Sequence, residues 1–142
     1  MNPAFSYYRL RLVAYLQDHF PEKSGDHSFI QERADTAAEA YSNAVRTGYS
    51  HNQAEEIASR TLFEGLHFSP HDTLVEVLWN EFADIVPYSY ATTLAVNLLP
   101  LAQPIFDRYA LSDNFAFTAE YELLYTELTG FILQIAEEHG IQ

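Results

Sequence analysis

Apolar side chains recur every three or four residues along most of this chain, and helix-starting and helix-stopping residues separate the runs. The clearest run lies between Leu62 and Pro87. Its Ser69-Pro70 step predicts a helix start, because a serine hydroxyl accepts a backbone N–H bond and proline is tolerated at the first helical position. Pro87 ends the run because it has no N–H group. The stripe between them consists of Leu74, Leu78, Phe82 and Ile85, which predicts a helix over 70–86.

Similar runs predict further helices over 4–20, 26–47, 50–64, 89–109 and 118–139. Gly48 is placed to cap the end of the second, and Ser50 with Gln53 matches a capping box at the start of the third. Pro100 and Pro104 should interrupt or kink the fifth segment, which gives two short pieces reaching Tyr109. We therefore expect an all-α protein, an irregular bundle of about six helices, with residues 1–142 forming a single domain.

The composition excludes several classes of protein. There is no cysteine, which removes disulfides, thiol nucleophiles and thiolate metal sites and fits a cytoplasmic protein. No apolar run approaches the roughly 20 residues that a membrane span needs. The first residues carry arginines inside an amphipathic pattern and make a poor signal peptide.

The negative charge is concentrated in the second half of the chain. The net charge is −13; residues 1–71 hold nine acids and six bases, whereas residues 72–142 hold eleven acids and one base, Arg108. Such a surface repels phosphate groups, so direct binding to nucleic acid or a membrane is disfavoured. Basic proteins and metal cations are the electrostatically matched partners. The alternative is an acidic surface that only keeps the protein in solution.

Four candidate metal ligands, Glu64, His67, His71 and Asp72, lie within nine residues. Glu64 and His67 have the Glu-x-x-His spacing of helical di-iron proteins, but such a site needs a second copy of the motif and two further glutamates. No second copy exists in the chain. The ligand count therefore favours capping, loop hydrogen bonds or exposure over metal binding.

Two polar residues fall inside apolar stripes. Glu81 lies in the stripe of the helix predicted over 70–86, and His19 lies in that of the first helix. A buried carboxylate must be paired or hydrogen-bonded, so we expect Glu81 to meet an arginine or a tyrosine hydroxyl. His19 is expected in or at the edge of the core. No catalytic or cofactor-binding residues emerge, since nothing resembles a second catalytic group or a phosphate-binding loop.

Several segments resemble one known family. They are SYYRLRLVAYL, RADTAAEAY, LFEGLHFSPHDTLVEVLWNEF, FDRYALSDNF and EYELLYTELTG, and they follow one another across nearly the whole chain. The chain resembles small acidic proteins of unknown function from Bacteroidetes, often found in conjugative or other mobile elements. The resemblance implies an all-helical single domain in a bacterial cytoplasm and transfers no activity.

The leading interpretation is a non-enzymatic interaction protein that binds another protein through an acidic surface bearing tyrosines, and a basic partner would match the charge of that surface. Tyr7, Tyr88 and Tyr90 fall outside the apolar stripes and are candidates for it. No cofactor is expected, and self-association remains an open alternative.

Two other functions compete with this interpretation. A nucleic-acid mimic would need carboxylates spaced along one ridge, for which the last helix offers Glu120, Glu122, Glu127, Glu137 and Glu138. A metal-dependent enzyme would rest on Glu64, His67 and His71 alone.

Overall fold

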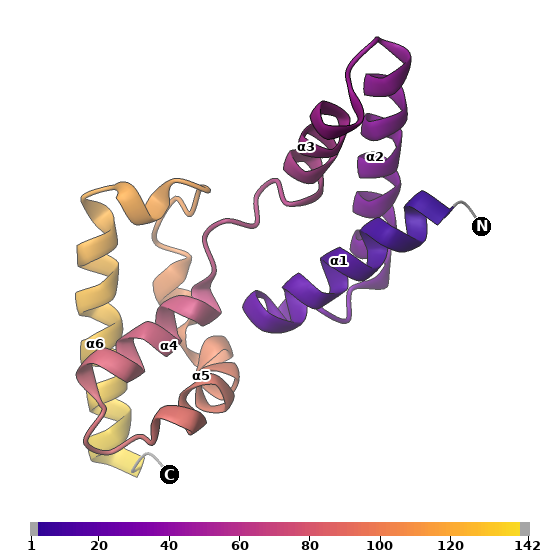
Figure 1. Ribbon diagram of the computed structural model, residues 1–142. Helices are drawn as coiled ribbons and strands as arrows, with labels where there is room; N and C mark the ends of the chain where they lie inside the picture. The colour runs from indigo at the N-terminus through magenta and orange to yellow at the C-terminus, as the bar shows by residue number, and fades with distance from the viewer. Residues whose placement is uncertain (1–2, 140–142) are drawn as a thin grey trace. The chain divides into compact units, whose positions relative to one another are not determined.

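A computed structural model describes residues 3–139 and the side chains of 7–139, and it is built from helices (Figure 1). Within that range there is no β-strand, so the predicted all-α fold with about six helices is confirmed. The same range holds three short 3-10 turns between the helices: η1 (Pro21–Lys23), η2 (Tyr88–Tyr90) and η3 (Phe115–Phe117). The helices are α1 (Pro3–His19), α2 (His27–Arg46), α3 (His51–Leu62), α4 (Pro70–Glu81), α5 (Ala91–Phe106) and α6 (Glu120–His139).

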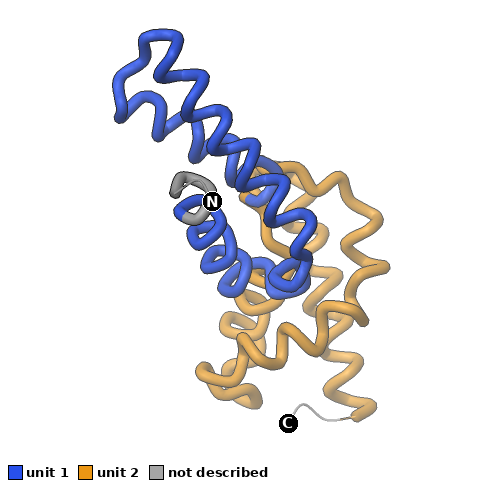
Figure 2. The backbone as a smooth tube through the Cα atoms, turned by 90° about the vertical axis from the view of Figure 1, so that its right-hand side faces the viewer, with its two compact units in different colours: residues 1–66 blue, residues 67–142 orange. Residues whose placement is uncertain are grey.

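The helices gather into two compact units, residues 1–66 and 67–142, which Figure 2 colours blue and orange. We call them unit 1 and unit 2. Each has a hydrophobic cluster of its own. The organisation of the chain as a single domain stays a prediction.

Unit 1 is held together by small residues on α2. Ala34, Ala37 and Ala38 are buried in its cluster, and short side chains let helices approach closely. The guanidinium of Arg33, the residue before Ala34, donates to three backbone carbonyls at the end of α3, including that of Glu64 at 2.6 Å. Because the last carbonyls of a helix have no partner within the helix, Arg33 ties α2 to the end of α3.

The predicted signals between α2 and α3 are confirmed. Gly48 has a φ of 104°, which favours glycine, and its N–H donates to the carbonyl of Val45. Ser50 accepts from the N–H of Gln53, whose side chain accepts from the N–H of Ser50 in return. These bonds end one helix and start the next within a few residues.

Helix α4 begins as predicted and ends early. The Ser69 hydroxyl accepts the N–H of Asp72 at 2.9 Å, and Pro70 is the first helical residue. The helix stops at Glu81 rather than at residue 86, because Phe82 leaves helical geometry with φ −128° and ψ 23°. Phe82 remains buried, whereas Ile85, the last residue of the predicted stripe, is 52% exposed and does not reach the core.

The predicted break in the fifth segment is wrong, since α5 runs unbroken through Pro100 and Pro104. Both prolines are exposed and lie one turn apart on the same face. The carbonyls that lose a helical N–H partner there can be hydrated, while Leu98, Leu99 and Ala102 hold the opposite face in the core.

Removal of the α4 cap should weaken unit 2. We expect Ser69→Ala to lower the free energy of unfolding by about 0.5–2 kcal/mol, because the N–H of Asp72 loses its acceptor. Urea unfolding followed by the fluorescence of Trp79, the only tryptophan, measures this. Ser42→Ala, at an exposed position within α2, is the control and should change little. A loss no larger than that of the control would contradict a stabilising cap.

The single-domain prediction is tested by two probes of the same unfolding reaction. Trp79 lies in unit 2 and reports on that unit, whereas far-ultraviolet circular dichroism reports on the helices of both. We expect the two urea transitions to coincide, as they do in a two-state domain. Separate midpoints would show that the units unfold independently.

Candidate functional site: an acidic groove lined by tyrosines

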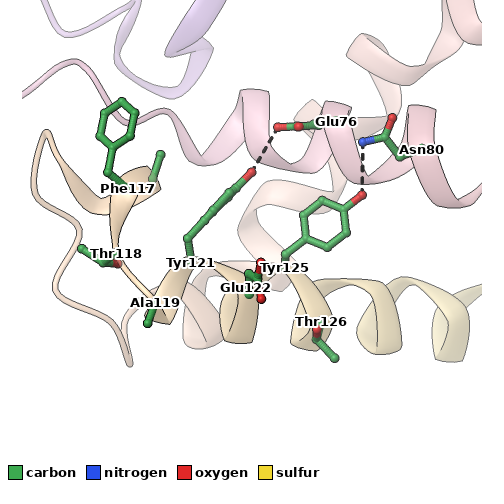
Figure 3. A pocket seen from close by; sticks show the side chains of 10 residues that line it. Glu76, Asn80, Phe117, Thr118, Ala119, Tyr121, Glu122, Tyr125 and Thr126 are labelled. Carbon is green, nitrogen blue, oxygen red and sulfur yellow. Dashed lines mark hydrogen bonds between the residues drawn. The ribbon is translucent and has the colours of Figure 1, made fainter.

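A groove with a volume of about 830 Å³ lies in unit 2, where α4, η3 and α6 meet (Figure 3). Helix α4 contributes a glutamate and an asparagine, and the other lining residues come from η3, the start of α6 and the residues between them. The lining residues are Glu76, Asn80, Ala116, Phe117, Thr118, Ala119, Tyr121, Glu122, Tyr125 and Thr126.

The lining side chains occupy the margins of two packed helices. Leu78 of α4 and Leu124 and Leu128 of α6 are fully buried in the cluster of unit 2. Residues four apart share a helical face, so Glu76 and Asn80 form one wall of the groove. The same spacing places Tyr121 above Tyr125 and Glu122 above Thr126 on α6.

Two hydrogen bonds fix the tyrosine rings between the helices (Figure 3). The Tyr121 hydroxyl donates to Oε2 of Glu76 at 3.1 Å, and Nδ2 of Asn80 donates to the Tyr125 hydroxyl at 3.3 Å. The two rings meet edge to face, with centroids 6.3 Å apart and planes at 84°. The groove therefore has an ordered aromatic wall.

Both tyrosines are held in their neutral form. Burial and the neighbouring Glu76 carboxylate raise the pKa of Tyr121 to about 12. Burial and the charges of Glu81 and Glu76 raise the pKa of Tyr125, although the hydrogen bond from Asn80 lowers it. A hydroxyl next to carboxylates resists ionisation because the second negative charge would be repelled.

The carboxylates of the groove lack a cationic partner among the described residues. Arg108, the one lysine or arginine of unit 2, forms an ion pair with Glu127, which also accepts from the Tyr109 hydroxyl. Glu76 and Glu122 are exposed and form no ion pair within residues 3–139. The groove thus carries a negative charge that is left uncompensated.

Phe117, in the 3-10 turn η3, lines one end of the groove. Phe115 is 2% exposed and packs edge-on against Phe68, with ring centroids 5.0 Å apart. Phe117, two residues further in the same 3-10 turn, is 87% exposed. Because Phe115 anchors the turn in the core, Phe117 is directed away from it.

Three of the candidate metal ligands lie in unit 2, where His67 and His71 contact other protein groups. Among residues 3–139, no group of three or more histidines, aspartates and glutamates is arranged to hold an ion. His71 is buried, with Nδ1 3.1 Å from the Asp72 carboxylate and Nε2 3.1 Å from the Thr92 carbonyl, so both ring nitrogens are engaged by protein atoms. His67 lies beside Asp113, whose carboxylate accepts its backbone N–H, and Glu64 is exposed.

The expectation of a buried carboxylate at position 81 is wrong. Glu81 is exposed because α4 ends there, so its side chain reaches water from the margin of the core. It is nevertheless close enough to act on the pKa of Tyr125. His19 is half-buried, and its ring lies 4.7 Å from that of Tyr15.

Sequence reasoning located the acidic half of the chain but chose other aromatic residues. Tyr7 and Tyr88 are exposed and Tyr90 is half-buried, yet none of them lines the groove. It did not select Tyr121, Tyr125 or Phe117. The available signal was a pair of tyrosines four residues apart on the edge of an apolar stripe, beside a glutamate.

Comparison with known proteins identifies the family. Residues 1–141 match the Domain of unknown function (DUF1896). The chain belongs to the DUF1896 family. A similar solved structure is the crystal structure of protein PG0816 from Porphyromonas gingivalis, with 46% sequence identity, a TM-score of 0.93, and coverage of 98% of this chain and 95% of that chain. No curated protein matches this chain.

The match confirms the resemblance to a family from Bacteroidetes, the group to which Porphyromonas gingivalis belongs. The association of DUF1896 proteins with mobile elements, like a cytoplasmic location, stays a prediction. In the described part of this chain, every helix is too short or too polar to cross a bilayer.

The raised pKa of Tyr121 predicts a pH dependence of stability. A phenol whose pKa is higher in the folded state contributes stability that is present below its unfolded pKa and is lost as the pH rises through the folded pKa. For Tyr121 that window lies between its ordinary value of 10.0 and about 12. We therefore expect Tyr121→Phe to reduce the fall in unfolding free energy over this range.

Urea unfolding at a series of alkaline pH values measures this effect. Tyr49→Phe, at an exposed tyrosine of unit 1, is the matched control. If the unfolding free energies of both variants fall with pH in parallel with that of the unsubstituted protein, the groove does not raise the pKa of Tyr121.

Proposed function

We propose that this DUF1896 protein is a non-enzymatic interaction module that binds a basic partner protein through the acidic groove of unit 2. One observation carries the proposal: the groove joins uncompensated carboxylates, Glu76 and Glu122, to an ordered wall of tyrosines. The wider surface has the same sign, since residues 67–142 hold eleven acids and one base.

The chemistry of the groove suits protein recognition. Complementary charge speeds the encounter of two proteins and aligns them. Tyrosine is enriched in interfaces because it offers a large, rigid contact area with a polar end. Phe117 adds an apolar contact at the edge of the groove. A basic segment with an apolar neighbour would meet matching groups along this surface.

The same geometry argues against acid–base catalysis in the groove. A catalytic acid or base works best when its pKa lies near the working pH. Burial and the Glu76 carboxylate instead raise the pKa of Tyr121 away from neutral pH, to about 12. Tyr121 and Glu76 therefore form a fixed hydrogen bond between α6 and α4.

The glutamates of α6 do not support nucleic-acid mimicry. Successive helical residues are separated by about 100° around the axis, so Glu122 lies roughly 200° from Glu120. Glu127 is half-buried and bound to Arg108 and Tyr109. By the same rotation Glu120, Glu127 and Glu138 share one face, whereas Glu122 and Glu137 lie on others. The five carboxylates therefore do not form the single ridge that a mimic needs, and we do not propose this function.

Binding of basic peptides tests the proposal. Short synthetic peptides rich in lysine and arginine should bind the protein at low salt, and their affinity should fall as salt is added. The variant Glu76→Gln/Glu122→Gln should weaken binding about tenfold, because it removes both charges of the groove. Fluorescence anisotropy of labelled peptides measures the dissociation constants.

The control is Glu137→Gln/Glu138→Gln, which removes the same charge from the last turn of α6, outside the groove. It should weaken binding about twofold or less. Equal losses in the two double variants would mean that the charge of the unit acts diffusely. That result, or a failure of all the peptides to bind, would overturn the proposal.

A further inference from the structure

We infer that the groove between α4 and α6 is built to hold an arginine side chain of the partner, in preference to lysine. The inference rests on the proposed function and specifies what the groove recognises. Arginine and lysine carry the same charge, but guanidinium is a flat fork of N–H donors, whereas ammonium is a compact and strongly hydrated charge. The groove offers groups that distinguish the two shapes.

The first of these groups is the aromatic wall. Tyr121 and Tyr125 are each tied to α4 through their hydroxyls, so their rings are held in place before any ligand arrives. A guanidinium stacks on an aromatic face and gains both cation–π and planar contact. Unit 1 shows this kind of contact within the protein, where the guanidinium carbon of Arg11 lies 5.4 Å from the ring centroids of Tyr7 and Phe63.

The second group is the set of carboxylate oxygens. Glu76 accepts from Tyr121 through Oε2, which leaves Oε1 without a hydrogen bond within the described residues. Glu122 has neither a hydrogen bond nor an ion pair there and lines the same groove (Figure 3). These oxygens only accept hydrogen bonds, and a guanidinium only donates them, with five N–H groups directed to two sides.

The third feature is the space for an aliphatic stem. Ala116, Thr118 and Ala119 line the groove together with Phe117 and Tyr121, and their side chains are small. The arginine stem is apolar and packs against hydrophobic surface while its head remains charged. Phe117, 87% exposed, would then contact the residue next to the arginine.

A pair of peptides that differ at one position tests this inference. The probe is an otherwise uncharged peptide with one arginine flanked by leucine, and its twin carries lysine in the same place. Isothermal titration calorimetry should show the arginine peptide binding about twofold to fivefold more tightly, the range that an exposed cation–π contact provides.

Variants at Tyr125 separate the ring from its hydroxyl. Tyr125→Phe keeps the ring and should retain the preference for arginine, whereas Tyr125→Leu should reduce it to less than twofold. Phe117→Ala should weaken the binding of both peptides without changing the ratio of their affinities. Tyr49→Leu, at an exposed tyrosine of unit 1, is the control and should change neither affinity. Trp79 fluorescence and circular dichroism verify that each variant is folded.

The outcomes distinguish this inference from the proposed function. Equal affinities for the two peptides, with binding still lost in Glu76→Gln/Glu122→Gln, would overturn the preference for arginine and leave the interaction module standing. A preference that persists in Tyr125→Leu would overturn the role of the aromatic wall. No binding of either twin, or of the basic peptides above, would remove the proposed function itself.

Discussion

Unit 2 depends on the burial of one apolar face of α4 against α5 and α6. Leu74 and Leu78 are fully buried there with Leu124 and Leu128, and full burial of such side chains contributes about 1.5–3 kcal/mol each. The groove lies beyond the edge of this apolar contact, where α4 and α6 no longer fully bury each other's side chains. Tyr121, one turn before Leu124 on α6, is close enough to the core to be fixed and far enough from it to reach Glu76.

The electrostatic character of the site follows from how the few cations are used. In unit 1, Arg33 caps the end of α3, and Arg11 lies between two aromatic rings and near Glu55. In unit 2, Arg108 is bound to Glu127. Unit 2 has no second lysine or arginine, so no such side chain pairs with the carboxylates beside the tyrosines. Unpaired carboxylates cost little only on a solvated surface.

Local signals predicted the fold well and the site poorly. The caps at Ser50 and Ser69 and the glycine at Gly48 are short-range features, in which a side chain or a φ angle satisfies backbone groups a few residues away. The break predicted at Pro100 and Pro104 is wrong because the free-energy cost of a proline in a helix depends on whether it lies on the solvent-exposed face. Glu81 misled it because periodicity does not show where a helix ends.

The sequence by itself determined that this chain is helical, where most helices begin, and which half carries the negative charge, since all three depend on residue type and spacing. Only the tertiary structure decided that Tyr121 meets Glu76 and Tyr125 meets Asn80, each pair separated by 45 positions. It also gave each unit a core of its own. These outcomes depend on which buried faces pack together, and many alternative pairings satisfy the same helical periodicity.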